Sequence, residues 1–261
     1  MILNRLQKIA DYFALISDDF IPLSVDLLPE RVRNKLQTAE TPPVVDDYDV
    51  YQQILRTKKA KSCVKGDLPK LFNNEFAPEL ALPLCKIINN IVQSGEWPYQ
   101  WKLEHVVPIA KVPMPESEDD LRPISLTPFF SKVTEQYVVK WLMLFIGNKL
   151  DVRQFGGLKE NATTHYLIEF VNFILFNQDS ADKTAVLAST VDFQKAFNRL
   201  DHCILVTKLS DFVVPGWLLK LVIALLKFRN AFSSKRFVHA RCPQGTKNAL
   251  LFVSRFDHWF C

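Results

Sequence analysis

The sequence predicts an α+β fold that is rich in helices and contains one small antiparallel sheet. Several segments repeat apolar side chains at spacings of three and four residues, which is typical of amphipathic helices. Two short apolar segments joined by a loop are typical of a β-hairpin. The 261 residues, 48% of them hydrophobic, are enough for one or two domains around a sizeable core.

The predicted helices follow one another along most of the chain. Residues 1–50 begin with helical periodicity and pass into a proline-punctuated acidic stretch, so we expect a lead-in or linker remnant without chemistry. Later helices are predicted over residues 78–92, 131–146, 163–176, 201–209 and 216–228. The side chain of Ser131 is the expected N-cap of the helix at 131–146. The apolar face of the helix at 163–176 is expected in the core.

The predicted strands fall into two places. Leu103–Ile109 and Leu121–Leu126 are the expected arms of the hairpin, and a loop with a strongly acidic end joins them. A β-branched run from Val186 to Val191 predicts a buried strand that ends just before Asp192.

Composition restricts the class of protein. The formal net charge of +4 permits a nucleic-acid partner without requiring one. Five scattered cysteines show neither zinc spacing nor a disulfide frame. The N-terminus has charges every few residues, unlike a signal peptide, and the longest apolar run, Trp217–Leu226, is too short to span a bilayer. We therefore expect a soluble intracellular protein, in the cytoplasm or nucleus, without a membrane partner.

Two stretches are strongly basic. Residues 56–65 hold five basic side chains and no acid, and residues 212–256 hold eight basic side chains, interspersed phenylalanines and no acid. Such stretches are either solvated surface or contacts to the phosphates of a nucleic acid, and composition alone leaves both interpretations open.

Asp192 at the end of a predicted buried strand needs compensation for its charge. A divalent metal would provide it, as in phosphoryl-transfer sites. A proton or an arginine partner would provide it equally well, and spacing alone favours this simpler alternative.

Seven short motifs then occur in an order that resembles the reverse transcriptase domain of non-LTR retrotransposons. The resemblance covers roughly residues 51–252, and each motif alone is weak. In order they are Lys-Gly-Asp-Leu-Pro at 65–69, Gly-Glu-Trp-Pro-Tyr-Gln-Trp-Lys at 95–102, Val-Pro-Ile-Ala-Lys at 107–111, Leu-Arg-Pro-Ile-Ser-Leu at 121–126 with Ser-Lys-Val-Thr-Glu at 131–135, Gln-Phe-Gly-Gly at 154–157, Val-Asp-Phe-Gln-Lys-Ala-Phe-Asn-Arg-Leu-Asp-His at 191–202, and Pro-Gln-Gly-Thr at 243–246.

The resemblance implies a right-hand polymerase architecture. Residues 51–185 would form a fingers-like region and residues 186–261 a partial palm with an incomplete antiparallel sheet. The implied activity is RNA-templated DNA synthesis, with an RNA template, a DNA primer and deoxynucleoside triphosphates as partners. The sequence gives no indication of a protein partner.

Individual residues take roles through the same resemblance. Asp192 looks like the first catalytic aspartate and a ligand of two Mg²⁺ ions, with the backbone carbonyl of Phe193 as a second ligand. Substrate contacts are implied for the side chains of Lys111 and Arg122 on the triphosphate, for Phe197 against the 2′ position of the sugar, and for Gln244 and Gly245 beside the incoming base.

The chain also departs from the family pattern. The second carboxylate motif, aromatic-x-Asp-Asp, does not follow Gly245 within the remaining sixteen residues, and Asn198 stands where the family has Asp. We therefore expect an incomplete copy, and whether it is itself an enzyme stays open. One alternative is an inactive remnant that at most binds nucleic acid. Another is an unrelated α/β protein in which Lys111, Arg122 and Asp192 do not share a cleft.

Overall fold

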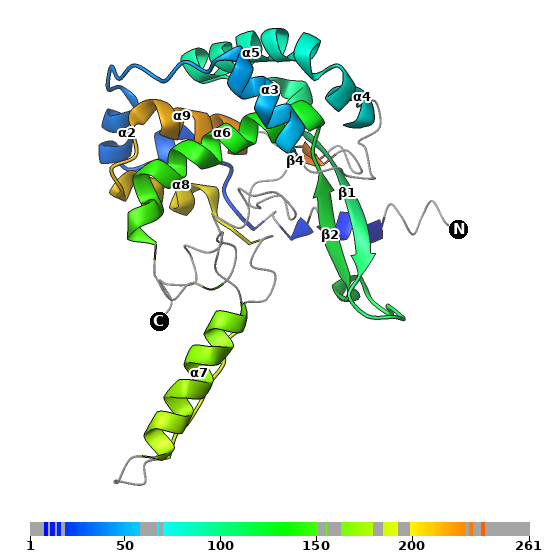
Figure 1. Ribbon diagram of the computed structural model, residues 1–261, viewed down its shortest axis with the longest axis vertical. Helices are drawn as coiled ribbons and strands as arrows, with labels where there is room; N and C mark the ends of the chain where they lie inside the picture. Colours follow the sequence, from blue (N-terminus) through cyan, green and yellow to red (C-terminus); the bar gives the residue numbers. More distant parts are fainter. Residues whose placement is uncertain are drawn as a thin grey trace.

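The fold is that of a helical body from which a β-hairpin and one helix project (Figure 1). The structure is a computed structural model, and it describes residues 8–9, 11–13, 15–16, 19–57, 67, 70–150, 155, 163–179, 185–192, 199–227, 230–231 and 236–237. In this part of the chain, no helix has both the length and the apolar character needed to cross a bilayer.

Helices make up most of the described residues, as the sequence predicts. All five helices predicted after residue 77 are present, with ends shifted by a few residues. Among the described residues there are also four short 3₁₀ turns: η1 (Val25–Leu27), η2 (Tyr99–Lys102), η3 (Glu118–Asp120) and η4 (Gly147–Lys149). The α-helices are α2 (Glu30–Leu36), α3 (Asp47–Arg56), α4 (Lys70–Glu75), α5 (Ala77–Ser94), α6 (Phe129–Ile146), α7 (Thr163–Gln178), α8 (His202–Asp211) and α9 (Gly216–Leu226).

The predicted hairpin is confirmed. Strands β1 (Leu103–Ala110) and β2 (Leu121–Leu126) pair antiparallel, from His105 opposite Leu126 to Ala110 opposite Leu121. Two-residue strands extend the sheet in the order β2-β1-β3-β4, with β3 (Asn230–Ala231) parallel to β1 and β4 (Arg236–Phe237) antiparallel to β3. The sheet built on the hairpin is therefore mixed, because β3 runs parallel to β1.

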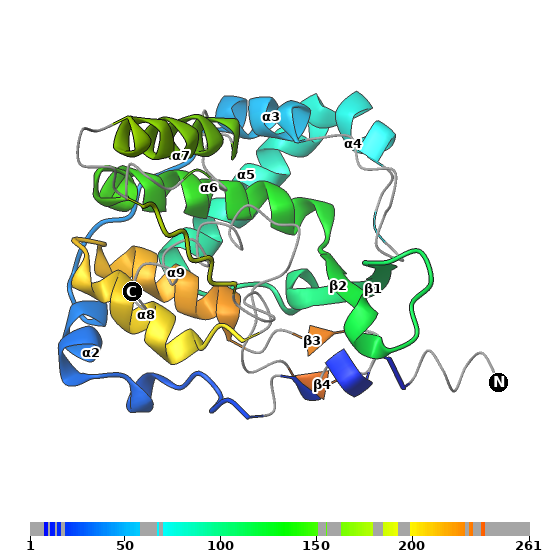
Figure 2. The same ribbon diagram turned by 90° about the horizontal axis from the view of Figure 1, so that it is seen from below.

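Helix α9 lies at the centre of the core. Its sequence is apolar on every side, and eight of its eleven residues are buried, which is typical of a helix enclosed by others. Helices α2, α5, α6 and α8 all contact it (Figure 2). Gly216 starts the helix against α2, where a Cβ would overlap the carbonyl oxygen of Lys35. Side chains between Leu23 and Val50 also belong to this core.

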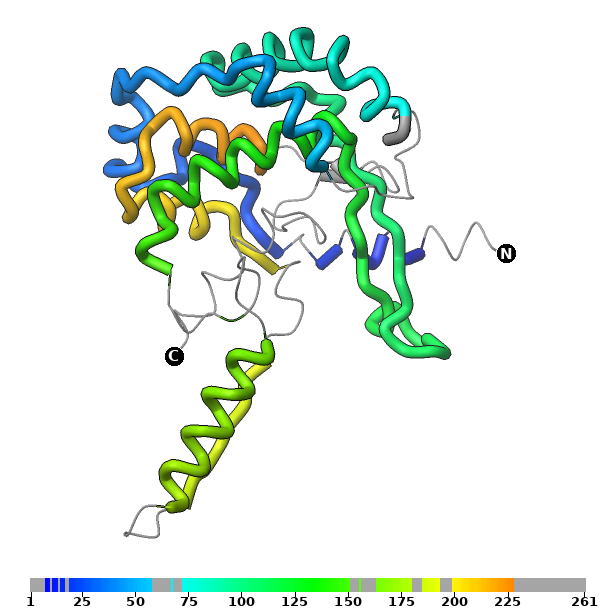
Figure 3. The backbone as a smooth tube through the Cα atoms, in the orientation of Figure 1, coloured from blue at the N-terminus to red at the C-terminus, as the bar shows by residue number. Residues whose placement is uncertain are grey.

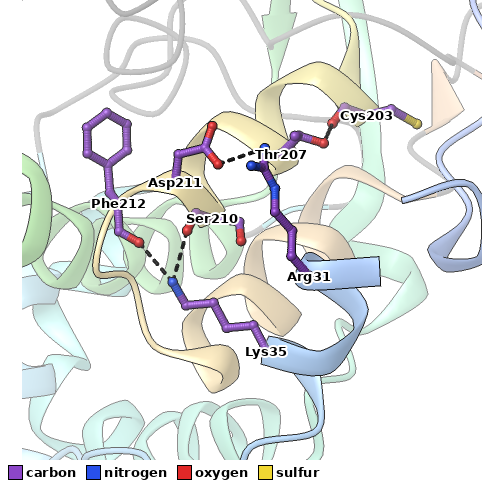
Figure 4. Close-up of polar contacts among 7 residues, drawn as sticks. All are labelled: Arg31, Lys35, Cys203, Thr207, Ser210, Asp211 and Phe212. Atoms are coloured by element: carbon purple, nitrogen blue, oxygen red, sulfur yellow. Dashed lines mark hydrogen bonds and ion pairs between the residues drawn. The ribbon is translucent and has the colours of Figure 1, made fainter. Parts of the chain in front are cut away.

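Polar contacts fasten α2 to the end of α8 (Figure 4). The Nζ of Lys35 donates hydrogen bonds to the carbonyl oxygens of Ser210 at 3.0 Å and Phe212 at 2.8 Å. Arg31 forms an ion pair with Asp211 at 2.9 Å. The last carbonyls of a helix have no partner within it, so Lys35 satisfies groups that α8 leaves open.

The motif at 95–102 supports the base of the hairpin. Gly95 ends α5 in the left-handed conformation, at φ 70°, which a residue without a Cβ adopts at little cost. Trp97 is buried and its ring lies edge-on to that of Trp101, 6.4 Å away. Trp101 in turn approaches Phe130 at the start of α6. The two tryptophans of this motif therefore lie where α5 ends and where β1 and α6 begin.

The predicted N-cap at Ser131 is wrong. Helix α6 begins two residues earlier, after Pro128, and Ser131 is buried inside the helix, where its hydroxyl donates to Glu135 at 3.2 Å. The cap comes from a distant residue, because the Asp67 carboxylate accepts a hydrogen bond from the backbone N–H of Phe129 at 2.7 Å.

The buried strand predicted at 186–191 is also wrong. Residues 185–192 have no regular secondary structure, and the side chains of Leu187 and Val191 are 95% and 78% exposed. No described residue pairs with this segment in the sheet, and a strand without a partner has no ladder of hydrogen bonds to hold it.

Helix α7 is present as predicted, but its apolar face is not in the core. The helix points away from the body (Figures 1 and 3), and none of its residues is buried. The side chains of Leu167, Val171 and Phe176 are 56%, 48% and 80% exposed. Periodicity predicted the apolar face of this helix correctly, but it could not show what covers that face.

Candidate nucleotide-binding hairpin

The structure brings Lys111 and Arg122 together on the β1–β2 hairpin. Arg122 is opposite Ile109 in the β1–β2 register, and the backbone N–H of Lys111 donates to the Asp120 carbonyl at 2.7 Å, which continues the pairing. Residues two apart on a strand share a face, so Lys111 and Arg122 are diagonal neighbours, about 7–8 Å apart. Both side chains are exposed.

The acids of the loop beside these two cations have several other partners. Glu118 forms an ion pair with Lys8 at 2.9 Å, and Asp119 accepts a hydrogen bond from the Tyr12 hydroxyl at 2.5 Å. The Lys111 ammonium donates to the backbone carbonyl of Asp119. Among the described residues, no carboxylate forms an ion pair with Arg122.

Asp120 holds the loop that joins the two strands. Its carboxylate accepts hydrogen bonds from the backbone N–H of Ser117 at 3.0 Å, from that of Glu116 at 3.1 Å, and from the Ser117 hydroxyl at 3.1 Å. The backbone bond from Ser117 is the main cause of a lowered pKa for Asp120, followed by that from Glu116. The carboxylate thus fixes the loop from which Lys111 projects.

The remaining predicted site residues do not join this pair in the described structure. Asp192 is exposed in the segment 185–192, and it forms no hydrogen bond or ion pair with another described residue. Phe193, Phe197, Gln244 and Gly245 lie outside the described residues. Asp201, next to the same motif, caps α8 by accepting from the N–H of Ile204 at 3.0 Å.

The described residues do not by themselves fit a two-metal centre. A site for two divalent ions needs several oxygen ligands in one place. Within the described ranges, no group of three or more His, Cys, Asp or Glu side chains is gathered in that way. Asp192 is the one predicted metal-ligating side chain that these ranges include.

Two features of the hairpin escaped prediction from sequence. Lys8 and Tyr12, in a segment to which we assigned no chemistry, hold its acidic loop. Asp67, in the motif at 65–69, caps the helix that follows β2. Both are contacts across many residues of sequence. For Asp67, the one available signal was its place in the motif at 65–69.

Comparisons with known proteins give one consistent result. The family model described as reverse transcriptase (RNA-dependent DNA polymerase) matches residues 110–260. In Drosophila melanogaster, the probable RNA-directed DNA polymerase from transposon BS is 31% identical over 67% of this chain. The corresponding polymerase from transposon X-element is 30% identical over 68%, and that from mobile element jockey 28% over 65%.

The chain spans about a fifth of the length of these relatives, at 20%, 20% and 19%. The family match covers more than half of the chain and includes Lys111, Arg122 and Asp192. The resemblance that the ordered motifs indicated is therefore confirmed, and the chain belongs to the reverse transcriptase family of RNA-dependent DNA polymerases.

Proposed function

We propose that this chain supplies the fingers-like region and part of the palm of an RNA-directed DNA polymerase. Residues 51–185 form the fingers-like region and residues 186–261 the partial palm. The substrates are an RNA template, a DNA primer and deoxynucleoside triphosphates. The family depends on divalent metal in general, and Mg²⁺ is the ion we propose for this chain.

The observation that carries the proposal is the pair of cations on one face of the β1–β2 hairpin. Arg122 offers a planar, permanently charged fork that suits phosphate oxygens, and Lys111 offers a compact point charge. Glu118 pairs with Lys8, and among the described residues no carboxylate forms an ion pair with Arg122, so its guanidinium is available to an anionic ligand.

Asp192 is the acid on which we propose that catalysis depends. It lies within the family match and is exposed, so its carboxylate is accessible from solvent. We propose Phe193 as the backbone ligand next to it, Phe197 as the residue that excludes ribonucleotides, and Gln244 and Gly245 as contacts of the incoming base.

Primer extension on an RNA template with Mg²⁺ tests this function. If this chain polymerises by itself, it incorporates nucleotides as the template directs, and Asp192→Asn is expected to abolish that incorporation while leaving template binding unchanged. Incorporation that persists in Asp192→Asn would show that the catalytic assignment is wrong. If wild type binds the template in a salt-sensitive way but incorporates nothing, the chain binds nucleic acid without polymerising.

A further inference from the structure

The start of the chain, dark blue in Figures 1 and 2, lies beside the β1–β2 hairpin. Residues 8–9 and 11–13 are helical, and Lys8 and Tyr12 are four positions apart, so both side chains lie on one side of the segment. Phe13, next to Tyr12, is only 7% exposed, so the segment is packed against the protein. Lys8 and Tyr12 therefore reach the hairpin from one fixed surface.

The turn η3 in the hairpin loop is held at each of its three residues. Glu118 forms the ion pair with Lys8 at 2.9 Å, and the Asp119 carboxylate accepts from the Tyr12 hydroxyl at 2.5 Å. The third residue, Asp120, is fixed by donors of the loop itself. The N-terminal segment thus holds the first two residues of the turn, and the loop holds the third.

Asp119 connects Tyr12 with Lys111. Its carboxylate accepts from the Tyr12 hydroxyl, and its backbone carbonyl accepts from the Lys111 ammonium. Both acceptors belong to one residue, so a movement of Asp119 that breaks the first contact also displaces the acceptor of the second. The side chain of Lys111 is exposed, and a lysine side chain is long and flexible, so this carbonyl restricts where its ammonium lies.

The two contacts of the N-terminal segment differ in strength. The Lys8 side chain is 74% exposed, and an ion pair of an exposed group contributes little and weakens as salt is added. The Tyr12 hydroxyl is half-buried and donates to a charged acceptor, which makes a stronger hydrogen bond than one between neutral groups. Tyr12 is therefore the main contact, and Lys8 adds a smaller, salt-dependent one.

We propose that Tyr12 is a positioning residue for nucleotide binding: through Asp119 it holds the Lys111 ammonium in place for the triphosphate, and Lys8 supports the same turn. The placement of Lys111 follows from contacts within this chain, whereas its consequence for the nucleotide rests on the proposed function. An ammonium that is held before the nucleotide arrives loses less entropy on binding than one that rotates freely. The N-terminal segment therefore acts on the hairpin without itself contacting the nucleotide.

Acylation of lysines by a limiting amount of an N-hydroxysuccinimide ester, quantified at each lysine by mass spectrometry, tests the placement without nucleotide. The Lys111 amine reacts only after its bond to the carbonyl breaks. Tyr12→Phe is therefore expected to speed its acylation about threefold relative to that of Lys86, an exposed lysine on α5. The matched control Tyr48→Phe removes a hydroxyl from α3 and is expected to leave this ratio unchanged. An unchanged ratio in Tyr12→Phe overturns the proposal.

A double-mutant cycle tests the consequence for the nucleotide. The measured quantity is the dissociation constant of a labelled deoxynucleoside triphosphate, with an RNA template and a DNA primer present. Tyr12→Phe is expected to weaken binding about threefold in wild type and in Arg122→Gln, and to have no effect in Lys111→Gln, because it acts through that ammonium. A general loss of structure would weaken binding equally in all three backgrounds. Lys8→Gln is expected to cause a smaller loss that disappears at high salt, and Lys8→Arg to cause none.

The two measurements separate this inference from the proposed function. If Tyr12→Phe speeds acylation but Lys111→Gln leaves the dissociation constant unchanged, the placement of Lys111 is supported and its proposed role in binding the triphosphate is wrong. If Lys111→Gln weakens binding and Tyr12→Phe has no effect, or an equal effect in every background, the proposed function is supported and Tyr12 is not a positioning residue.

Discussion

Single side chains connect distant parts of this chain. Asp67 is the clearest example, because it satisfies the first N–H of α6 from a position 62 residues earlier in sequence. Pro128, which occupies the N-cap position itself, has no side-chain oxygen to offer. The local sequence pattern instead predicted Ser131 as the N-cap. The sequence therefore predicted the helix but not its cap, since caps supplied across the fold leave no local pattern.

Replacing Asp67 with alanine is expected to lower the free energy of unfolding by about 1–2 kcal/mol, the usual cost of losing a helix cap. Urea denaturation measures the change. Asp67→Asn is the matched variant, because its amide oxygen still accepts the bond, and it is expected to lose less. Equal stability of wild type and Asp67→Ala would show that the contact with Phe129 contributes nothing.

Asp120 makes the hairpin loop sensitive to acid. Its pKa is lower in the folded protein than the ordinary value of 3.8, mainly because of the Ser117 N–H bond. A depressed pKa means that the carboxylate contributes stability above pH 3.8 and that this contribution is lost as the pH falls through the folded pKa. An NMR titration of the Asp120 carboxyl carbon is expected to show a midpoint below 3.8. Ser117→Ala, which removes the hydroxyl donor, should raise that midpoint, and a wild-type midpoint at or above 3.8 contradicts the assignment.

At the scale of whole elements, α7 and α9 show what periodicity does and does not determine. Both are apolar helices, and the sequence predicted both. Helix α9 is enclosed by four neighbours, whereas every described side chain of α7 is at least partly exposed. The run at 186–191 shows the same gap between pattern and burial, because its β-branched residues are typical of a strand but lack a partner.

The two helices are expected to respond differently to loss of a large side chain. Leu219→Ala in α9 removes a fully buried side chain and is expected to cost about 2–5 kcal/mol of unfolding free energy. Phe176→Ala in α7 removes one that is 80% exposed and is expected to change it by less than about 0.5 kcal/mol. Thermal or urea unfolding measures both. A large loss for Phe176→Ala would mean that α7 packs against something in solution.

For the whole molecule, the order of motifs predicted more than any single pattern. It indicated the family, and it marked both cations of the hairpin. The pairing of β1 with β2 places Lys111 and Arg122 on the same face, which the sequence alone did not show. The ion pair of Lys8 with Glu118 could not be predicted, because nothing local marks two residues so far apart as partners.

The central claim is that Lys111 and Arg122 bind the triphosphate of an incoming nucleotide. The most direct measurement is the dissociation constant of a labelled deoxynucleoside triphosphate, with an RNA template and a DNA primer present. Lys111→Gln and Arg122→Gln are each expected to weaken binding about tenfold, because each removes a charged hydrogen bond to phosphate. The control Arg33→Gln removes the same charge from α2, on the far side of the molecule (Figure 2), and is expected to leave the constant nearly unchanged. Equal affinity in wild type and both hairpin variants would contradict the claim.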